Sequence, residues 1–355
     1  MIDLKDYGYT MEFEKAFEEM RSPGLEPARV VALHRSGYRI LWAQGESDAQ
    51  VLGKFRFQAS GPGDFPAVGD FVACEIGDRG STGMIHGLLP RKSRFSRKMA
   101  GNTSGEQVLA CNFDYVYIMA SMNHDLNMNR LERYLTAAWE SNGTPVVVLT
   151  KSDLCEEPEE IMAMVEARTF GVPVHAVSGV TGAGLEALDA YEKKGKTIVF
   201  LGSSGVGKST LLNHRYGKEV METNAIREDD SRGRHTTTRR ELFLLPSGAM
   251  VIDTPGMREL SLWDGQEGLQ ETFRDILELA CRCRFQDCTH SREPGCAVLE
   301  AVRLGTIQEN HLESHRKLQK EIAYNLGRKQ TQEKLAQKEK GKQLSKLIRH
   351  HKKGR

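Results

Sequence analysis

The stretch from residue 196 to 213, KTIVFLGSSGVGKSTLLN, restricts the fold of this chain more than any other part. Its first half, TIVFL, is apolar and rich in β-branched residues, which is typical of a strand buried on both faces. The next eight residues match G-x-x-x-x-G-K-[ST] at every fixed position, and a helix is predicted to follow. A glycine-rich turn would match this pattern by chance in only about one or two per cent of chains of this length. The sequence therefore predicts a strand, a phosphate-binding loop and a helix.

The residues of this loop have expected roles in binding a nucleotide. Backbone N–H groups of the loop and the helix N-terminus face the phosphate chain. Lys208 is expected to reach the β- and γ-phosphates and to act in catalysis, and the Ser209 hydroxyl is expected to bind Mg²⁺. The predicted nucleotide-binding residues here are Gly202, Ser203, Ser204, Gly205, Val206, Gly207, Lys208, Ser209 and Thr210.

The 355 residues exceed one ordinary domain, and the hydrophobic pattern changes along the chain. From about residue 107, short apolar strands alternate with helices such as 129–142, which Gly143 is predicted to end. This alternation indicates a mostly parallel sheet covered on both faces. The predicted strands are 115–120, 146–149, 172–177, 197–201, 241–245 and 249–252.

Residues 28–95 instead contain five short β-type runs separated by turn residues, which predicts a small all-β, OB-type barrel. The runs are 28–33, 38–43, 50–57, 70–75 and 83–89. The segment 90–98, PRKSRFSRK, follows with five cations around one aromatic residue. It is read equally well as a solvated linker or as an edge that contacts nucleic-acid phosphates.

Two further motifs are predicted at the ends of strands, where ligands bind in such sheets. In the first, Thr150-Lys151-Ser152-Asp153, the Asp can accept two hydrogen bonds from guanine, and the Lys stem can cover the ring. In the second, which runs from Asp253 to Gly256, Asp253 would hold Mg²⁺ through water and the N–H of Gly256 would sense the γ-phosphate. A polar segment, GRHTTT at 233–238, suits a loop in which Thr237 binds Mg²⁺.

The order of these motifs is unusual. Guanine-nucleotide switches carry the phosphate loop first and the base-reading motif downstream, but here Asp153 precedes Gly202 by 49 residues. The set is complete and rotated, which predicts a circularly permuted GTPase domain.

Cysteine and histidine residues gather near the C-terminus. The segment 281–296 holds four cysteines and one histidine, and four such ligands suit a tetrahedral Zn²⁺ ion of structural type. Cys281 makes a fifth candidate ligand. Seven cysteines in all, unevenly spaced, favour a reducing compartment over a disulfide framework.

This combination resembles the RsgA family of small-subunit-dependent ribosomal GTPases over nearly the whole chain. The matching motifs are PRKSRFSRK, TKSD, SGVTGAGL at 178–185, GSSGVGKST, GRHTTT, DTPGMREL and the cysteine segment. The resemblance implies that Ser178 belongs to the base-binding site. It also implies that His235 positions the attacking water, because the apolar side chain of Met257 cannot orient a water molecule. It also selects Cys283, Cys288, His290 and Cys296 as zinc ligands and leaves Cys281 spare. Thr150 departs from the family's Asn, which braces a neighbouring loop, and a weaker affinity for guanine is the expected result.

The predicted organisation is then an N-terminal extension (1–27), the barrel (28–98), the permuted GTPase domain (107–263), a helical zinc-binding domain (264–327) and a basic tail (328–355). From Arg316 onward there are 14 basic and 3 acidic residues, against 35 and 45 in the rest of the chain. Such a tail either contacts RNA or only keeps the protein soluble.

We therefore expect a GTPase that binds GTP with Mg²⁺, holds one structural zinc ion and acts on the small ribosomal subunit and its rRNA. We expect the protein to lie in the cytoplasm without a membrane partner, because no long apolar run or signal peptide is recognisable. We also expect it to be a monomer. The alternatives are an NTPase acting on another RNA such as tRNA, and a nucleotide-regulated RNA-binding module with little turnover.

Overall fold

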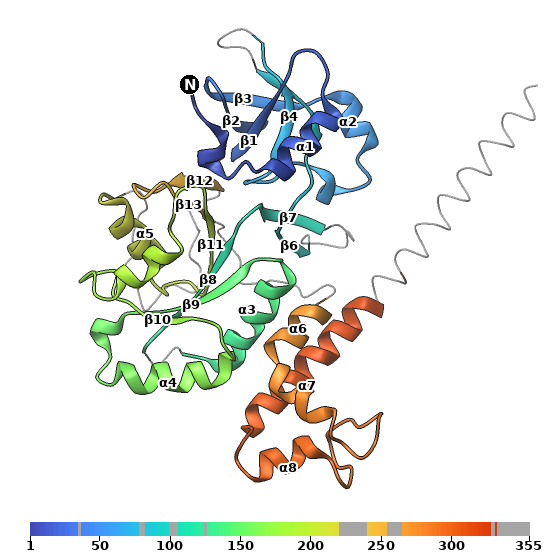
Figure 1. Cartoon of the computed structure of the whole chain (residues 1–355), viewed down its shortest axis with the longest axis vertical. Coiled ribbons are helices and arrows are strands. Elements are labelled where there is room, and N and C mark those ends of the chain that lie inside the picture. The colour runs from blue at the N-terminus through green and yellow to red at the C-terminus, as the bar shows by residue number, and fades with distance from the viewer. Residues whose placement is uncertain are drawn as a thin grey trace, which may run out of the picture. The chain divides into compact units, whose positions relative to one another are not determined.

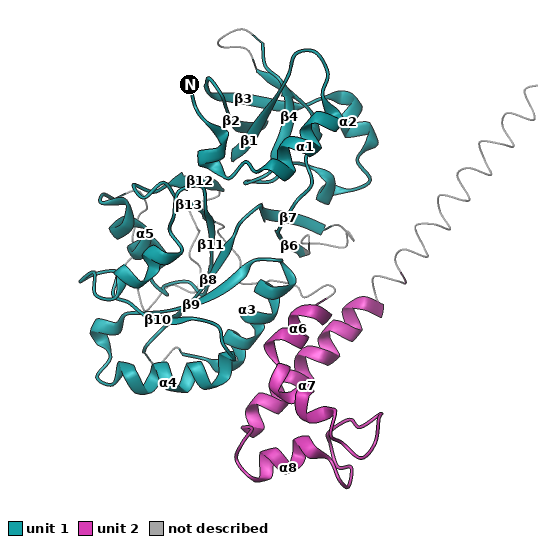
Figure 2. Cartoon of the chain, in the orientation of Figure 1, with its two compact units in different colours: residues 1–261 teal, residues 262–355 magenta. Residues whose placement is uncertain are grey.

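The computed structural model describes residues 1–34, 37–77, 82–98, 106–123, 126–219, 240–253, 265–327 and 331. The chain forms two compact units, Met1–Ser261 and Leu262–Arg355, which are coloured separately in Figure 2.

The first part of unit 1 is a closed five-stranded barrel (Figure 1). Its strands are β1 (Leu25–His34), β2 (Gly37–Trp42), β3 (Gly45–Val51), β4 (Phe71–Glu75) and β5 (Gly83–Leu88). They follow the order β1-β2-β3-β5-β4, and β4 pairs back with β1. Only the β3–β5 pair is parallel. Small and β-branched side chains such as Val30, Ile40 and Val72 fill the interior, and the predicted OB-type barrel is confirmed.

The sequence prediction of a strand over 50–57 is wrong for most of its length. Strand β3 ends at Val51, and the next residues form helix α2 (Gly53–Gln58). Polar and apolar residues alternate in the segment KFRFQ as in a strand, but Phe55 packs against the barrel core whereas Phe57 is 92% exposed. The contact between the rings of Phe55 and Phe65, whose centroids are 6.2 Å apart, is tertiary and cannot be read from local alternation.

The basic segment 90–98 is more ordered than a linker. Strand β6 (Arg94–Lys98) pairs with β7 (Glu106–Cys111) in an antiparallel hairpin. The Arg91 guanidinium lies 2.7 Å from the carboxylate of buried Asp70, and Lys92 Nζ lies 3.0 Å from Asp114 Oδ1. The first two cations therefore have protein partners, which weakens the interpretation of this segment as an edge for phosphates.

The N-terminal extension packs on the barrel. Its 3₁₀ helix η1 (Leu4–Tyr7) and helix α1 (Met11–Met20) bury Leu4, Phe13 and Phe17. These side chains form one apolar cluster with Phe71 and Leu89 of the barrel region.

The second part of unit 1 is an α/β domain whose sheet has the order β10-β9-β8-β11-β13-β12. Its strands are β8 (Tyr115–Ser121), β9 (Thr144–Thr150), β10 (Val174–Ala176), β11 (Thr197–Gly202), β12 (Glu241–Leu244) and β13 (Met250–Asp253). All neighbouring pairs are parallel except β12–β13. Helices α3 (Met128–Glu140), α4 (Pro158–Thr169) and α5 (Lys208–Tyr216) connect them. The predicted mostly parallel sheet is confirmed.

Helix α3 differs in detail from its prediction. It ends at Glu140, and the residue in the left-handed conformation is Asn142 (φ 61°), not Gly143. Gly143 instead faces Phe113, whose ring would lie 2.6 Å from an added Cβ. The helix also buries Glu132, which forms an ion pair of 2.9 Å with Arg168 of α4.

The barrel and the α/β sheet are joined edge to edge. Ala32 of β1 pairs with Glu241 of β12, so eleven strands form one hydrogen-bonded sheet. Arg29, also in β1, is fully buried.

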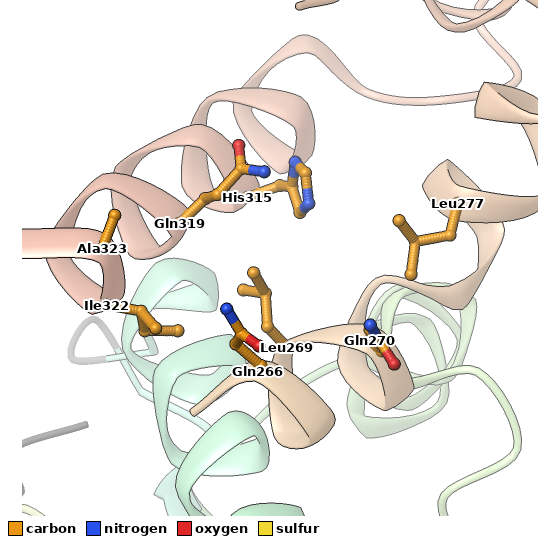
Figure 3. A pocket seen from close by; sticks show the side chains of 8 residues that line it. All are labelled: Gln266, Leu269, Gln270, Leu277, His315, Gln319, Ile322 and Ala323. Carbon is orange, nitrogen blue, oxygen red and sulfur yellow. The ribbon is translucent and has the colours of Figure 1, made fainter. Parts of the chain in front are cut away.

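Unit 2 is helical where it is described. It contains α6 (Gln266–Thr272), α7 (Arg274–Ala280), α8 (Ala297–Arg303) and a last helix whose described part runs over 309–327. A cavity of about 340 Å³ opens between α6, α7 and the last helix, with Leu269, Leu277 and Ile322 on its walls (Figure 3). His315 also faces it, and burial lowers the pKa of this imidazole to about 4. Among the described helices of both units, none has the length and apolar character that crossing a bilayer requires.

Candidate nucleotide site and metal centre

The phosphate-binding loop connects β11 to α5 at the centre of the α/β sheet. Gly205 (φ 74°) and Gly207 (φ 104°) adopt left-handed conformations that favour glycine. At Gly202 an added Cβ would lie 2.6 Å from the Met119 carbonyl oxygen of β8. The loop turns tightly because these three positions lack a side chain.

Lys208 is the first residue of α5, and its ammonium lies over the loop. The Nζ atom donates hydrogen bonds to the carbonyl oxygens of Gly202 (2.8 Å) and Ser203 (2.6 Å). Together with the positive end of α5, this cation favours a bound polyanion at the loop. Ser209 and Thr210 follow in the first turn of the same helix.

Thr150 contacts this loop directly. Its hydroxyl lies 2.5 Å from the Val206 carbonyl oxygen, to which it donates, and 3.3 Å from the Ala120 carbonyl oxygen. The side chain is almost fully buried. A threonine at this position therefore braces the phosphate loop, as expected of the Asn that it replaces.

The rest of the base-reading motif follows Thr150 at the end of β9. Lys151 has a left-handed backbone (φ 60°), and Ser152 and Asp153 lie in the short 3₁₀ helix η3 (Ser152–Leu154). The Asp153 side chain is exposed, and the backbone N–H of Ser152 donates to the Val177 carbonyl oxygen (3.2 Å). This bond places the motif beside the segment that begins with Ser178.

Ser178 is fully buried and organises its own loop. Its Oγ accepts hydrogen bonds from the backbone N–H groups of Val180 (3.3 Å) and Thr181 (3.1 Å). Residues 178–184 form a loop, the base loop.

Asp253 is the last residue of β13, the strand next to β11. It is 9% exposed and lies at the same edge of the sheet as the phosphate loop. Because β9, β10, β11 and β13 are parallel, their carboxyl ends bring the motifs at 150–153, 178, 202–210 and 253 together. The predicted residues His235, Thr237 and Gly256 lie outside the described residues.

The candidate metal centre is in unit 2. The ligand atoms of Cys283, Cys288, His290 and Cys296 all lie within 4.8 Å of one another. His290 turns Nδ1 toward them, at 3.4 Å from Cys296 Sγ and 3.6 Å from Cys283 Sγ. Cys281 is exposed and does not belong to this group.

The donor set fits a zinc ion. Tetrahedral Zn²⁺ with Zn–S bonds of about 2.3 Å places two thiolate sulfurs about 3.8 Å apart, and Cys283 and Cys296 have their Sγ atoms 3.8 Å apart. Cys296 also caps α8, since its sulfur accepts the Leu299 N–H (3.4 Å). A helix N-terminus favours the thiolate form that a metal requires.

Known proteins resemble the chain over nearly its full length. The "Small ribosomal subunit biogenesis GTPase RsgA 2" of Lactiplantibacillus plantarum is 44% identical over 91% of this chain and 90% of its own. The "RsgA 1" protein of Listeria innocua is 44% identical over 99% of both chains.

Two solved structures also resemble this chain in fold. YjeQ from Thermotoga maritima superposes with a TM-score of 0.63 at 28% identity, over 84% of this chain and 99% of its own. YloQ, described as a circularly permuted GTPase, superposes with a TM-score of 0.59 at 25% identity, over 84% and 95%. The family model described as RsgA GTPase matches residues 88–263. The chain therefore belongs to the RsgA GTPase family, and its motif order is that of a circularly permuted GTPase.

Proposed function

We propose that this protein binds the small ribosomal subunit and hydrolyses GTP there during late maturation or an assembly checkpoint, with the subunit stimulating hydrolysis. The observation that carries this proposal is the extent of the similarity. Relatives named as small ribosomal subunit biogenesis GTPases match the barrel and the cysteine-containing unit as well as the GTPase domain. In this role the protein works as a monomer in the cytoplasm, where subunits mature.

In this proposal the residues of the nucleotide site have the following roles. Lys208 and the loop N–H groups bind the phosphates, and Asp153 selects guanine. Ser209, Asp253 and Thr237 would hold the Mg²⁺ ion that accompanies GTP, and the bound ion would offset the negative charge of the phosphates. His235 positions water.

The zinc ion has a structural role in this proposal. Three thiolates and one imidazole complete its coordination, so no position remains for a reacting water. Cys283, Cys288, His290 and Cys296 would thus fix the loop between α7 and α8.

RNA contact is supported by one exposed face of the barrel. Helix α2 has no fully buried residue, and Phe57 is exposed, as are the cationic Lys54 and Arg56 of the same helix. Exposed aromatic rings beside cations suit stacking on an RNA base with phosphates nearby. The tail, with its excess of positive charge, adds sequence-independent attraction.

The test is the turnover of GTP and of ATP by full-length protein, alone and with isolated small subunits, large subunits or tRNA. We expect slow GTP turnover that rises many-fold with small subunits only. The control is Lys208→Ala, which should lose turnover in every mixture.

Equal stimulation by tRNA, or a preference for ATP, would overturn the ribosomal assignment and favour an NTPase that acts on another RNA. Subunit binding without turnover in any mixture would favour a nucleotide-regulated binding module.

A further inference from the structure

The base loop packs directly on the helix that starts at the phosphate loop. An added Cβ on Gly179 would lie 3.2 Å from both the Leu211 backbone nitrogen and Thr210 Cγ2. His214 Nδ1 lies 3.2 Å from the Gly179 carbonyl oxygen, so this nitrogen carries the proton and donates it. Residues 210, 211 and 214 share one face of α5, because side chains three and four apart are neighbours on a helix.

Arg215, also in the last turn of α5, holds the segment that follows the base loop. Its Nη2 donates to the Leu185 carbonyl oxygen (2.5 Å) and lies 2.9 Å from Asp189 Oδ1. Its Nε lies 3.0 Å from Glu192 Oε2. The guanidinium thus fixes both ends of the 3₁₀ helix η4 (Leu185–Ala190), which begins where the base loop ends.

The partners of Arg215 are themselves anchored in the sheet domain. The Glu192 side chain is 5% exposed, and its Oε1 lies 3.4 Å from the Tyr117 hydroxyl of β8. Burial raises the pKa of Glu192 to about 7, and Arg215 is the cation that opposes this rise. The connection from α5 through Arg215 to Glu192 and β8 is therefore largely shielded from water.

We propose that Arg215, assisted by His214, is a positioning residue that sets the distance between the guanine and phosphate ends of the nucleotide. Helix α5 begins at Lys208, at the phosphate end, and its last turn holds the base loop, at the guanine end. This inference rests on the proposed nucleotide site. Removing Arg215 should loosen η4, and through it the base loop that leads into η4, but should leave the phosphate loop and Lys208 in place.

The test compares GDP with inorganic tripolyphosphate as ligands of the full-length, zinc-loaded protein, by titration calorimetry. Tripolyphosphate occupies the phosphate loop alone, whereas GDP also needs the base loop. For Arg215→Gln we expect the Kd for GDP to rise roughly tenfold, because small misplacements of binding groups are costly. The Kd for tripolyphosphate should stay within about twofold. Arg215→Lys, which keeps the charge but loses the planar fork, should fall between Gln and wild type.

Arg168→Gln is the matched control. It breaks another buried ion pair, with Glu132, between α3 and α4 of the same domain, and neither residue belongs to the phosphate loop or the base loop. We expect it to lower the melting temperature without changing the Kd for GDP.

Two results would overturn the positioning role: an unchanged Kd for GDP in Arg215→Gln, or equal weakening of GDP and tripolyphosphate. If Arg215→Gln does not fold, Arg215→Lys and Glu192→Gln are read by the same criterion. Wild-type protein that binds ADP as tightly as GDP would instead contradict the guanine site itself, together with this inference.

Discussion

At the scale of single residues, the seven cysteines occupy three different environments. Cys74 and Cys111 are fully buried, and burial raises the pKa of the Cys74 thiol to about 12 and that of Cys111 well above its usual value. Three others face one another around the proposed zinc ion. Cys281 is exposed, and Cys155 is half-buried. Because the thiolate is the reactive form, these environments predict different reactivities.

We expect iodoacetamide at neutral pH to modify only Cys281 and Cys155 in the native, zinc-loaded protein. A chelator should make Cys283, Cys288 and Cys296 reactive as well, because zinc no longer protects their sulfurs. Peptide mass spectrometry before and after chelation measures this, and Cys74 serves as an internal control that stays unmodified. Protection of Cys281 by zinc, or labelling of Cys283 before chelation, would contradict the assigned ligand set.

The residues predictable from sequence are those whose function lies in a few consecutive positions. The phosphate loop, the motif from Thr150 to Asp153 and the cysteine segment are of this kind. The first two follow parallel strands of one sheet, and the four ligand atoms of the third lie within 4.8 Å of one another. Arg29, Glu132 and Arg215 had no such signal. Arg168, the partner of Glu132, is 36 residues away, and no local pattern shows which charge will be buried beside which partner.

At the scale of elements, helix α2 shows how tertiary packing overrides local alternation. Aromatic residues at 55 and 57 would share one face of a strand, but in the helix Phe55 turns toward the barrel and Phe57 toward solvent. The parallel strands were easier to predict, since burial on both faces makes them continuous apolar runs. The exposure of Phe57 is thus a consequence of the fold that only the structure reveals.

We expect Phe57→Ala to weaken binding to isolated small subunits by roughly tenfold, since stacking on one base contributes about 1–3 kcal/mol. Phe57→Trp should retain most of the affinity because it keeps an aromatic face. Co-sedimentation with a non-hydrolysable GTP analogue measures the effect, and GTP turnover without subunits should not change. Phe170→Ala removes another exposed ring (51%) on the α/β domain and is the control. Equal losses in the two alanine variants would argue against a specific contact of α2.

At the scale of the whole molecule, Arg29 connects the parts of unit 1. From β1 of the barrel, it donates to the carbonyl oxygens of Tyr7 (2.5 Å) and Asn112 (3.3 Å) and to Thr197 Oγ1 (3.0 Å) at the start of β11. Burial lowers the pKa of its guanidinium to about 10, so the side chain remains charged at neutral pH. The N-terminal extension, the barrel and the GTPase domain thus share one buried cation.

This arrangement predicts that the barrel and the GTPase domain unfold together. Hydrogen exchange should give the amides of β1, β8 and β11 similar free energies of opening, whereas zinc removal should speed exchange only in residues 265–327.

Arg29→Ala should lower the free energy of unfolding of unit 1 by about 3 kcal/mol or more, because buried carbonyl groups lose their donor and a cavity forms. The exchange rates of the barrel and the GTPase domain should then separate. Arg39→Ala, which removes an exposed barrel arginine 3.6 Å from Asp48, should cost less than about 1 kcal/mol. If the barrel already opens independently in the wild-type protein, the eleven-stranded sheet does not act as one cooperative unit, and Arg29 stabilises only its own surroundings.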